Sequence, residues 1–166
     1  LDFNPARGTQ AIRPGHYCGG LTIKNDANVF AEPGIYIISG GKLEVGNNAT
    51  FHGEHVGFYF ADDAATLVFK DRAVVELSAP RDGLMAGILF FENPSAPPDR
   101  SFEIASDSVR KLLGTIYLPR GVFKGNGTLV DTVLSTVQGV AASVTQAAGL
   151  PTIGAASAYT VIVANR

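Results

Sequence analysis

The sequence is poor in cysteine, methionine and tryptophan. Its 166 residues include one cysteine, Cys18, so no disulfide can form within the chain. We expect Cys18 to be a small buried side chain in a strand, or to pair with a cysteine outside this sequence. There is one methionine and no tryptophan against 19 glycines, a composition that favours many turns between short strands.

An excess of charge of one sign is also missing. The 13 basic and 15 acidic residues give a net charge of −2 and are dispersed along the chain. Nucleic-acid-binding proteins gather Lys and Arg on one face. We therefore predict no nucleic-acid partner.

Long apolar runs are absent as well. No stretch approaches the roughly 20 apolar residues of a membrane helix, and no signal segment opens the chain. Contact with a membrane is thus expected only through a segment outside this sequence. Because Leu1 is not a natural start, we expect residues 1–166 to be one domain that belongs to a longer chain.

What the sequence does contain is repetition. Two Pro-Gly pairs, Pro14-Gly15 and Pro33-Gly34, lie 19 residues apart. Each opens a short run with β-branched or aromatic residues, and each run is followed by a Gly-Gly pair. Proline and glycine supply turn geometry, and runs this short suit strands better than helices. Residues 1–13 lack the pattern and are predicted to be an irregular N-terminal loop.

A second repeat interleaves with the first. Each copy reads Asx, any residue, Ala, any residue, then a large apolar residue, and the copies begin at Asn25, Asn47, Asp63 and Asp71. The Asx side chain favours the turn, and Ala is small enough to face inward at a tight corner. Self-similarity at about 20 residues is the mark of a solenoid. The predicted fold class is an all-β solenoid, a right-handed β-helix.

Three segments depart from the repeat. Residues 93–100 hold three prolines and predict a surface loop. Residues 129–148 place apolar side chains at spacings of three and four, which predicts one helix docked on the solenoid. The last predicted strand, residues 158–164, ends within three residues of the terminus, so one edge of the sheet would be left open. Its residues are therefore a candidate partner-binding edge: Tyr159, Thr160, Val161, Ile162 and Val163.

Residues with catalytic or metal-binding chemistry are few. Asp62 and Asp63 are adjacent, and neighbours on a strand point to opposite faces, so they fit a turn better than a paired acid and base. His52, Glu54 and His55 lie in a segment whose spacing is not a reliable metal geometry. We expect no catalytic residues, no cofactor and no metal, and hence no enzyme.

Seven segments, taken in order, resemble one protein family. They share short motifs spread over nearly the whole chain: residues 14–20, 33–38, 53–60, 77–80, 86–91, 112–119 and 158–164. Together they resemble the C-terminal region of bacterial TadG-like proteins, which are associated with Tad/Flp pilus assembly. Residues 125–156 depart from the family pattern, so the predicted helix has no counterpart there.

The resemblance implies an extracytoplasmic place, in the periplasm or at the cell surface, and a structural or adhesive role. It implies envelope or pilus proteins as partners, and the terminal strand adds the option of self-association. A carbohydrate-binding or carbohydrate-cleaving β-helix stays open as an alternative. It would need exposed aromatics, for which Phe3, Phe102 and Phe123 are the candidates. Most other aromatics fall at strand positions that we assign to the core. An ice-binding solenoid fits less well, because Thr22, Thr50, Thr66 and Thr115 do not recur at one position.

Overall fold

Every element in the described part of the chain is a β-strand. The computed structural model describes residues 2–3, 9–125, 142–143 and 160–164, with the side chains of residues 9–125. Sheet A consists of β1 (Asp2–Phe3), β4 (Leu21–Ile23), β7 (Leu43–Val45), β10 (Leu67–Phe69), β13 (Ser101–Ile104) and β15 (Val122–Gly125). Sheet B consists of β2 (Thr9–Ile12), β5 (Asn28–Ala31), β8 (Thr50–Gly53), β11 (Val74–Ser78) and the first half of β14 (Val109–Leu118).

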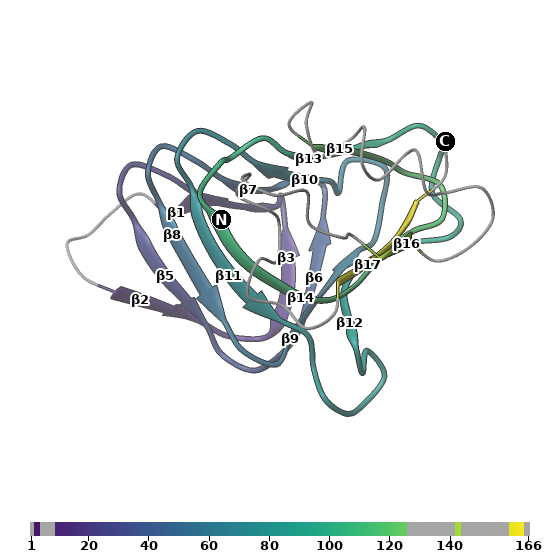
Figure 1. The fold of residues 1–166 in the computed structure, drawn as a ribbon, viewed down its shortest axis with the longest axis horizontal. Coiled ribbons are helices and arrows are strands. Elements are labelled where there is room, and N and C mark those ends of the chain that lie inside the picture. The colour runs from purple at the N-terminus through teal and green to yellow at the C-terminus, as the bar shows by residue number, and fades with distance from the viewer. Residues whose placement is uncertain (1, 4–8, 126–141, 144–159, 165–166) are drawn as a thin grey trace.

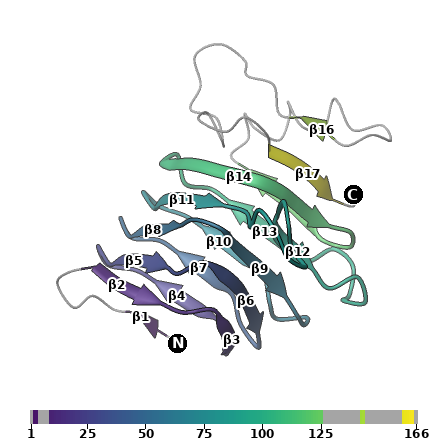
Figure 2. The ribbon, with the colours of Figure 1, turned by 90° about the horizontal axis from the view of Figure 1, so that it is seen from below.

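Sheet C completes the three-sided arrangement. It consists of β3 (Gly15–Cys18), β6 (Gly34–Ser39), β9 (Val56–Phe60), β12 (Ile88–Glu92), the second half of β14, β17 (Thr160–Ala164) and β16 (Ala142–Ser143). From β1 to β15 the chain visits sheets A, B and C in turn, and each of these strands pairs in parallel with the strand one turn away (Figure 1). β17 pairs in parallel with β14, and β16 pairs in antiparallel fashion with β17. Figure 2 shows the turns stacked from β1 at one end to β14 and β17 at the other. The predicted all-β solenoid is confirmed, with about five turns; its right-handed winding stays a prediction.

The interior is filled by like residues stacked one turn above another. On sheet A, Leu21 pairs with Leu43 and Leu43 with Leu67, and all three side chains are buried. On sheet C, the rings of Tyr36 and Phe58 stack with centroids 5.1 Å apart. Such pairs contribute about 0.5–1.5 kcal/mol beyond the burial of their area. A parallel register that repeats apolar positions therefore builds one continuous core.

Of the four copies of the Asx-x-Ala repeat, the copy that begins at Asp63 lies between sheets C and A, whereas the other three form the corner between sheets A and B. Ala27, Ala49 and Ala73 are buried there, as the repeat predicts. The preceding residues adopt positive φ, a conformation that Asn and Asp tolerate better than most residues: Asn25, Asp26, Asn47, Asn48 and Asp71. Their side chains also join consecutive turns. The Asn47 amide donates to Asn25 Oδ1 at 3.0 Å, and Arg72 Nε donates to Asn48 Oδ1 at 2.8 Å.

The observed register differs from the sequence offset by two residues. Gly15 pairs with Tyr36, 21 residues later, instead of with Gly34. Because side chains alternate along a strand, a shift of two keeps every residue on its predicted face. The Tyr17 and Tyr36 rings still meet, with centroids 5.8 Å apart. The motif thus identified the face correctly and the partner incorrectly.

Two segment predictions are wrong where the structure describes them. The predicted irregular loop, residues 1–13, contains β1 and β2, which pair with β4 and β5. These short segments are strands because they form hydrogen bonds with the next turn of the solenoid. Their own residues do not show the alternating apolar pattern from which a strand is predicted. The predicted helix, residues 129–148, lies outside the described residues except for Ala142–Ser143, which form strand β16. There a neighbouring strand overrides the helical spacing.

The fourth turn is longer than the others because loops are inserted into it. Val68 pairs with Glu103, 35 residues later, whereas Glu44 pairs with Val68 after 24. One insertion is residues 79–87, which lead into β12. The other is the predicted proline-rich loop, residues 93–100, most of which is exposed as expected. Its Ala96 and Arg100 are nevertheless buried, so the loop is anchored at both its middle and its end.

Candidate functional site

The outer face of sheet C carries a row of apolar side chains that we call the aromatic ladder: Ile37, Tyr59, Phe91 and Tyr117. Backbone register places each of them directly beside the next, on four consecutive turns. All four are half-buried, and Tyr117 pairs through its backbone with Val163 of β17. The row of described side chains therefore ends at Tyr117, and the backbone of β17 lies beside it.

The rings of the ladder stack on one another. The centroids of Tyr59 and Phe91 are 5.6 Å apart with planes at 27°, and those of Phe91 and Tyr117 are 5.3 Å apart at 21°. Each ring thus covers a face of its neighbour, so that ring edges, more than ring faces, are left for contact with a partner. A stripe of apolar edges on a regular sheet is a surface to which another flat apolar surface can pack.

The outer face of sheet A is charged. Glu44 there lies 3.2 Å from Lys24 Nζ and 2.7 Å from Lys70 Nζ. Burial alone would raise the pKa of the Glu44 carboxyl, but hydrogen bonds and charge from Lys70 and Lys24 outweigh it and hold that pKa below its ordinary value. The same contact with Glu44 raises the pKa of Lys70. This face is therefore a solvated ionic surface and presents no apolar stripe.

The outer face of sheet B is mixed. Phe30, His52, Glu76 and Lys111 occupy one outward position on consecutive turns. His52 Nδ1 lies 3.3 Å from Glu76 Oε2, and a shallow groove of about 210 Å³ runs past these side chains. Of the three faces, sheet C is the one where apolar side chains recur without a charged residue between them.

The predicted partner-binding edge lies at the end of sheet C. β17 pairs in parallel with β14 over five residue pairs, from Gly114 with Thr160 to Leu118 with Ala164. On its other side β16 pairs in antiparallel fashion with Val161 and Ile162. The chain therefore covers part of this edge itself. Tyr159 lies outside the described residues, and pairing of Thr160, Val161, Ile162 and Val163 with a partner stays a prediction.

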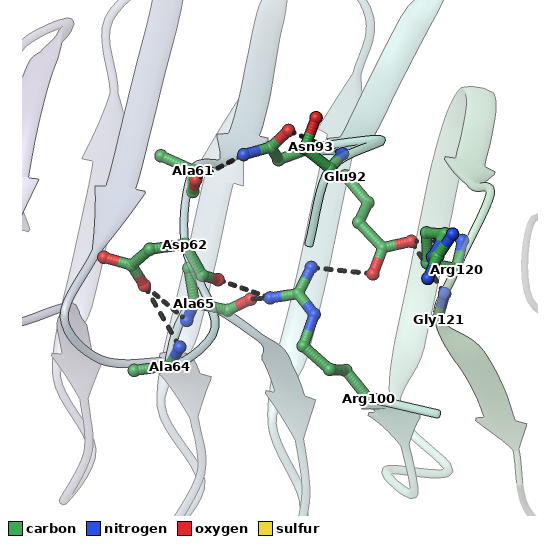
Figure 3. A network of polar contacts seen from close by, with 10 residues as sticks. Ala61, Asp62, Ala64, Ala65, Glu92, Asn93, Arg100, Arg120 and Gly121 are labelled. Atoms are coloured by element: carbon green, nitrogen blue, oxygen red, sulfur yellow. Dashed lines mark hydrogen bonds and ion pairs between the residues drawn. The ribbon is translucent and has the colours of Figure 1, made fainter. Parts of the chain in front are cut away.

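A buried ion pair holds the corner between sheets C and A (Figure 3). Glu92 is 0% exposed and Arg100 8% exposed, and Arg100 Nη2 donates to Glu92 Oε1 at 2.7 Å. The other carboxylate oxygen accepts hydrogen bonds from the backbone N–H groups of Arg120 and Gly121 at 2.9 and 2.7 Å. Arg100 Nη1 donates to the carbonyl oxygens of Asp62 and Ala65.

This network joins the turn of residues 62–65, the two ends of the proline-rich loop at Glu92 and Arg100, and residues 120–121. Glu92 occupies an inward position, in register with Phe60, where an apolar residue would otherwise stand. Arg100 also lies over the Phe102 ring, 5.4 Å from its centroid. Nearly all the polar atoms of the pair are used by hydrogen bonds to the chain itself. Arg100 Nε is the exception, since it is buried without a hydrogen-bond partner in the described part of the chain. The pair therefore joins the two ends of the proline-rich loop and has a structural role.

The carboxylates and the histidines considered above do not converge. Asp62 is a turn residue as predicted, and its Oδ1 accepts from the N–H groups of Ala64 and Ala65 at 3.1 and 3.0 Å. In the described part of the chain no group of three or more His, Cys, Asp or Glu side chains is placed to hold a metal ion. His52 faces Glu76, whereas His55 lies at the corner between sheets B and C.

Three other residue predictions can be compared with the structure. The expectation that Cys18 is buried is wrong: it is exposed at an outward position of sheet C, with its Sγ 3.7 Å from His16 Nε2. Pairing with a cysteine outside this sequence stays a prediction. Phe102 was a candidate exposed aromatic and is fully buried. The threonines do lie apart, with Thr22 on sheet A, Thr50 on sheet B and Thr115 on sheet C.

The aromatic ladder was missed because strand aromatics were assigned to the core. A signal for it exists in the sequence. Tyr59 is followed by Phe60 and Phe90 by Phe91, and in a strand adjacent side chains point to opposite faces. One member of each pair must then face outward. Consecutive aromatics in a repeat therefore indicate an apolar outer face as well as an apolar core.

A scan against protein-family models, a search of curated proteins and a search of solved structures found no match to this chain. The resemblance to TadG-like proteins accordingly stays a prediction. Among the described residues, no helix has the length and apolar character needed to cross a membrane.

Proposed function

We propose that this chain is a non-enzymatic interaction domain that lies outside the cytoplasm and binds other envelope proteins through the aromatic ladder. The observation that carries the proposal is the in-register row of Ile37, Tyr59, Phe91 and Tyr117, on the one face without charged residues in the row. Protein interfaces are rich in aromatic residues and poor in charged ones at their centres. The expected partner surface is flat and apolar.

The pilus-associated context rests on the resemblance of seven sequence segments to TadG-like proteins. A stacked scaffold of this type holds its outward side chains at fixed spacing, so that little conformational entropy is lost when a partner binds. Envelope or pilus proteins are therefore the partners we propose. The terminal strand, β17, lies at the end of the same face and would extend it by pairing with a partner strand.

A carbohydrate-binding role is the second candidate, because exposed aromatics are what that role requires. In the ladder, however, both faces of Phe91 are opposite other rings, Tyr59 and Tyr117. Sugars pack on the faces of aromatic rings, so a stacked ladder offers them less than isolated rings would. The geometry thus favours a protein partner.

The test is binding of envelope proteins and of purified surface polysaccharides to the immobilised chain. The variant Tyr59→Thr/Tyr117→Thr removes two rings and keeps a β-branched residue suited to a strand. Val68→Thr, at a half-buried outward position of sheet A, is the matched control. We expect identified envelope proteins to bind the wild type and the control and to lose binding in the double variant. Binding of a polysaccharide instead, with the same dependence on the two rings, would replace this proposal with the carbohydrate role.

A further inference from the structure

The loop of residues 80–87 presents one leucine almost entirely to solvent. Leu84 is 96% exposed, whereas the next residue, Met85, is 7% exposed. In Figure 1 the loop that leads into β12 projects from the lower side of the molecule. A single exposed leucine is ordinary on a surface. One at the tip of a fixed, projecting loop is a knob that can be inserted into a partner.

The loop is held in place rather than free. Gly87 N–H donates to the Pro80 carbonyl at 2.8 Å, which closes the loop at its base. Met85 lies over Gly57 on the outer side of sheet C, where a Cβ on residue 57 would come within 3.0 Å of Met85 Cε. Because the loop is anchored on both sides of Leu84, the position of the knob is defined by the fold.

A groove lies directly beside the knob. It has a volume of about 490 Å³ and is formed between residues 81–85 of the loop and Pro33, Gly34 and Ile35 of the neighbouring turn. His55 also lines it, and the buried His55 Nδ1 has no hydrogen-bond partner in the described part of the chain. The groove therefore has both apolar and charged lining, and Leu84 itself forms part of its wall.

We propose that the occupant of this groove is a second copy of the chain, and that the two copies form a symmetric dimer through the loop of residues 80–87. A twofold interface uses the same patch on both copies, so the patch must contain both a knob and a groove. Leu84 and the groove satisfy this condition side by side. Leu84 of each copy enters the groove of the other.

The charges at the loop tip are self-complementary as well. Arg81 and Asp82 are adjacent, exposed and of opposite sign, and both line the groove. In a twofold arrangement Arg81 of one copy faces Asp82 of the other, and the pair occurs twice. A partner of a different kind would have to supply this alternation by chance, whereas a second copy supplies it by symmetry. This dimer does not depend on the proposed function of the aromatic ladder.

The test is the association of the purified 166-residue chain, measured by sedimentation equilibrium over a range of concentrations. The wild type should dimerise, and Leu84→Asp should weaken dimerisation by about tenfold or more, as expected for a buried anchor residue. Since Leu84 is exposed in the monomer, the thermal unfolding of the Leu84→Asp variant should match that of the wild type. Misfolding of the variant would then be excluded as the cause of weaker dimerisation. Asp63→Arg, on an exposed turn elsewhere, is the charge control and should dimerise like the wild type.

Charge reversal tests the symmetry of the interface. Arg81→Asp and Asp82→Arg should each weaken dimerisation, because like charges then face each other twice. The double variant Arg81→Asp/Asp82→Arg, and an equimolar mixture of the two single variants, should both restore it. A wild type that stays monomeric at its highest soluble concentration would overturn the proposal. So would a dimer that Leu84→Asp leaves intact, or single variants that neither the double variant nor the mixture rescues.

Discussion

At the scale of single residues, Arg100 is buried and held by several contacts. Its guanidinium pairs with Glu92, a carboxylate fully removed from solvent, and donates to two backbone carbonyl oxygens. Replacing one member of a buried pair leaves the other charge uncompensated, which typically costs about 3–5 kcal/mol. Arg100→Met should therefore lower the free energy of unfolding by about that amount, measured by denaturant titration.

The second member of the pair provides the control. Adding Glu92→Gln to Arg100→Met removes the orphaned charge and keeps an acceptor for the N–H groups of Arg120 and Gly121. The double variant should be more stable than Arg100→Met alone. An equal or larger loss in the double variant would mean that Glu92 is not the charge that Arg100 compensates.

Glu44 gives the molecule a pH-dependent contribution on sheet A. Its pKa is held below the ordinary value of 4.5 by Lys70 and Lys24. A carboxyl whose native pKa is lowered stabilises the fold above its unfolded pKa, and this contribution disappears as the pH falls through the native pKa. Glu44→Gln should thus cost about 0.5–1 kcal/mol at pH 7, since the side chains are partly exposed.

As the pH falls from the ordinary pKa through the lowered native pKa of Glu44, the difference in stability between wild type and Glu44→Gln should shrink and finally vanish. Denaturant titrations of both proteins at pH 7 and at about pH 3 measure it. A difference that is the same at both pH values would show that the ion pairs contribute nothing and that the loss is one of packing. High salt should reduce the difference at pH 7, because charges near the surface are screened.

At the scale of elements, the loop of residues 80–87 depends on the missing side chain of Gly57. A valine there would occupy the space that Met85 fills, because even a Cβ lies 3.0 Å from Met85 Cε and 3.1 Å from its Sδ. Gly57→Val should lower the free energy of unfolding by about 1–3 kcal/mol, the usual cost of overpacking. In a Met85→Ala background the same substitution should cost much less. Equal costs in both backgrounds would refute the contact.

The terminal strand gives the second element-scale prediction. β17 pairs with β14 along five residues and lies at the end of the outer face that carries the ladder. Deletion of Tyr159 to Arg166 should abolish assembly with the partner, because it removes both the strand edge and the last row of sheet C. Co-sedimentation with identified envelope proteins measures this. Unchanged assembly would exclude the terminal strand as a contact.

Elements were predictable from the sequence where the repeat is regular. The Asx-x-Ala corners and the Tyr36 to Phe58 stack follow from residue type and period alone. β2 was missed because pairing with the next turn, rather than its own residues, makes it a strand. Residues 142–143 were assigned to a helix from their apolar spacing. That spacing carries no information about their pairing with β17, which makes them a strand.

At the scale of the whole molecule, the solenoid fold could be predicted from the sequence. Which side chains lie on its outer faces could be predicted only in part. Interior positions repeat in the sequence, whereas the outer face depends on which of two adjacent aromatics points inward, and that is decided by register. Tyr59 and Phe91 are strand aromatics that were assigned to the core, but they point outward and are half-buried. Phe102 was a candidate for exposure and is fully buried. The buried Glu92 and Arg100 pair could not be predicted because its members meet through a loop.

The central proposal is that the solenoid turns its apolar face, sheet C, toward protein partners and keeps the polar outer faces of sheets A and B in solvent. Site-specific photo-crosslinking in cells tests this directly, with a photoreactive phenylalanine at position 59 of sheet C or at position 68 of sheet A. Residues 59 and 68 are both half-buried and outward, so their accessibility is matched. We expect position 59 to yield adducts with identified envelope proteins and position 68 to yield none. Equal adducts from both positions, or none from position 59, would contradict the account.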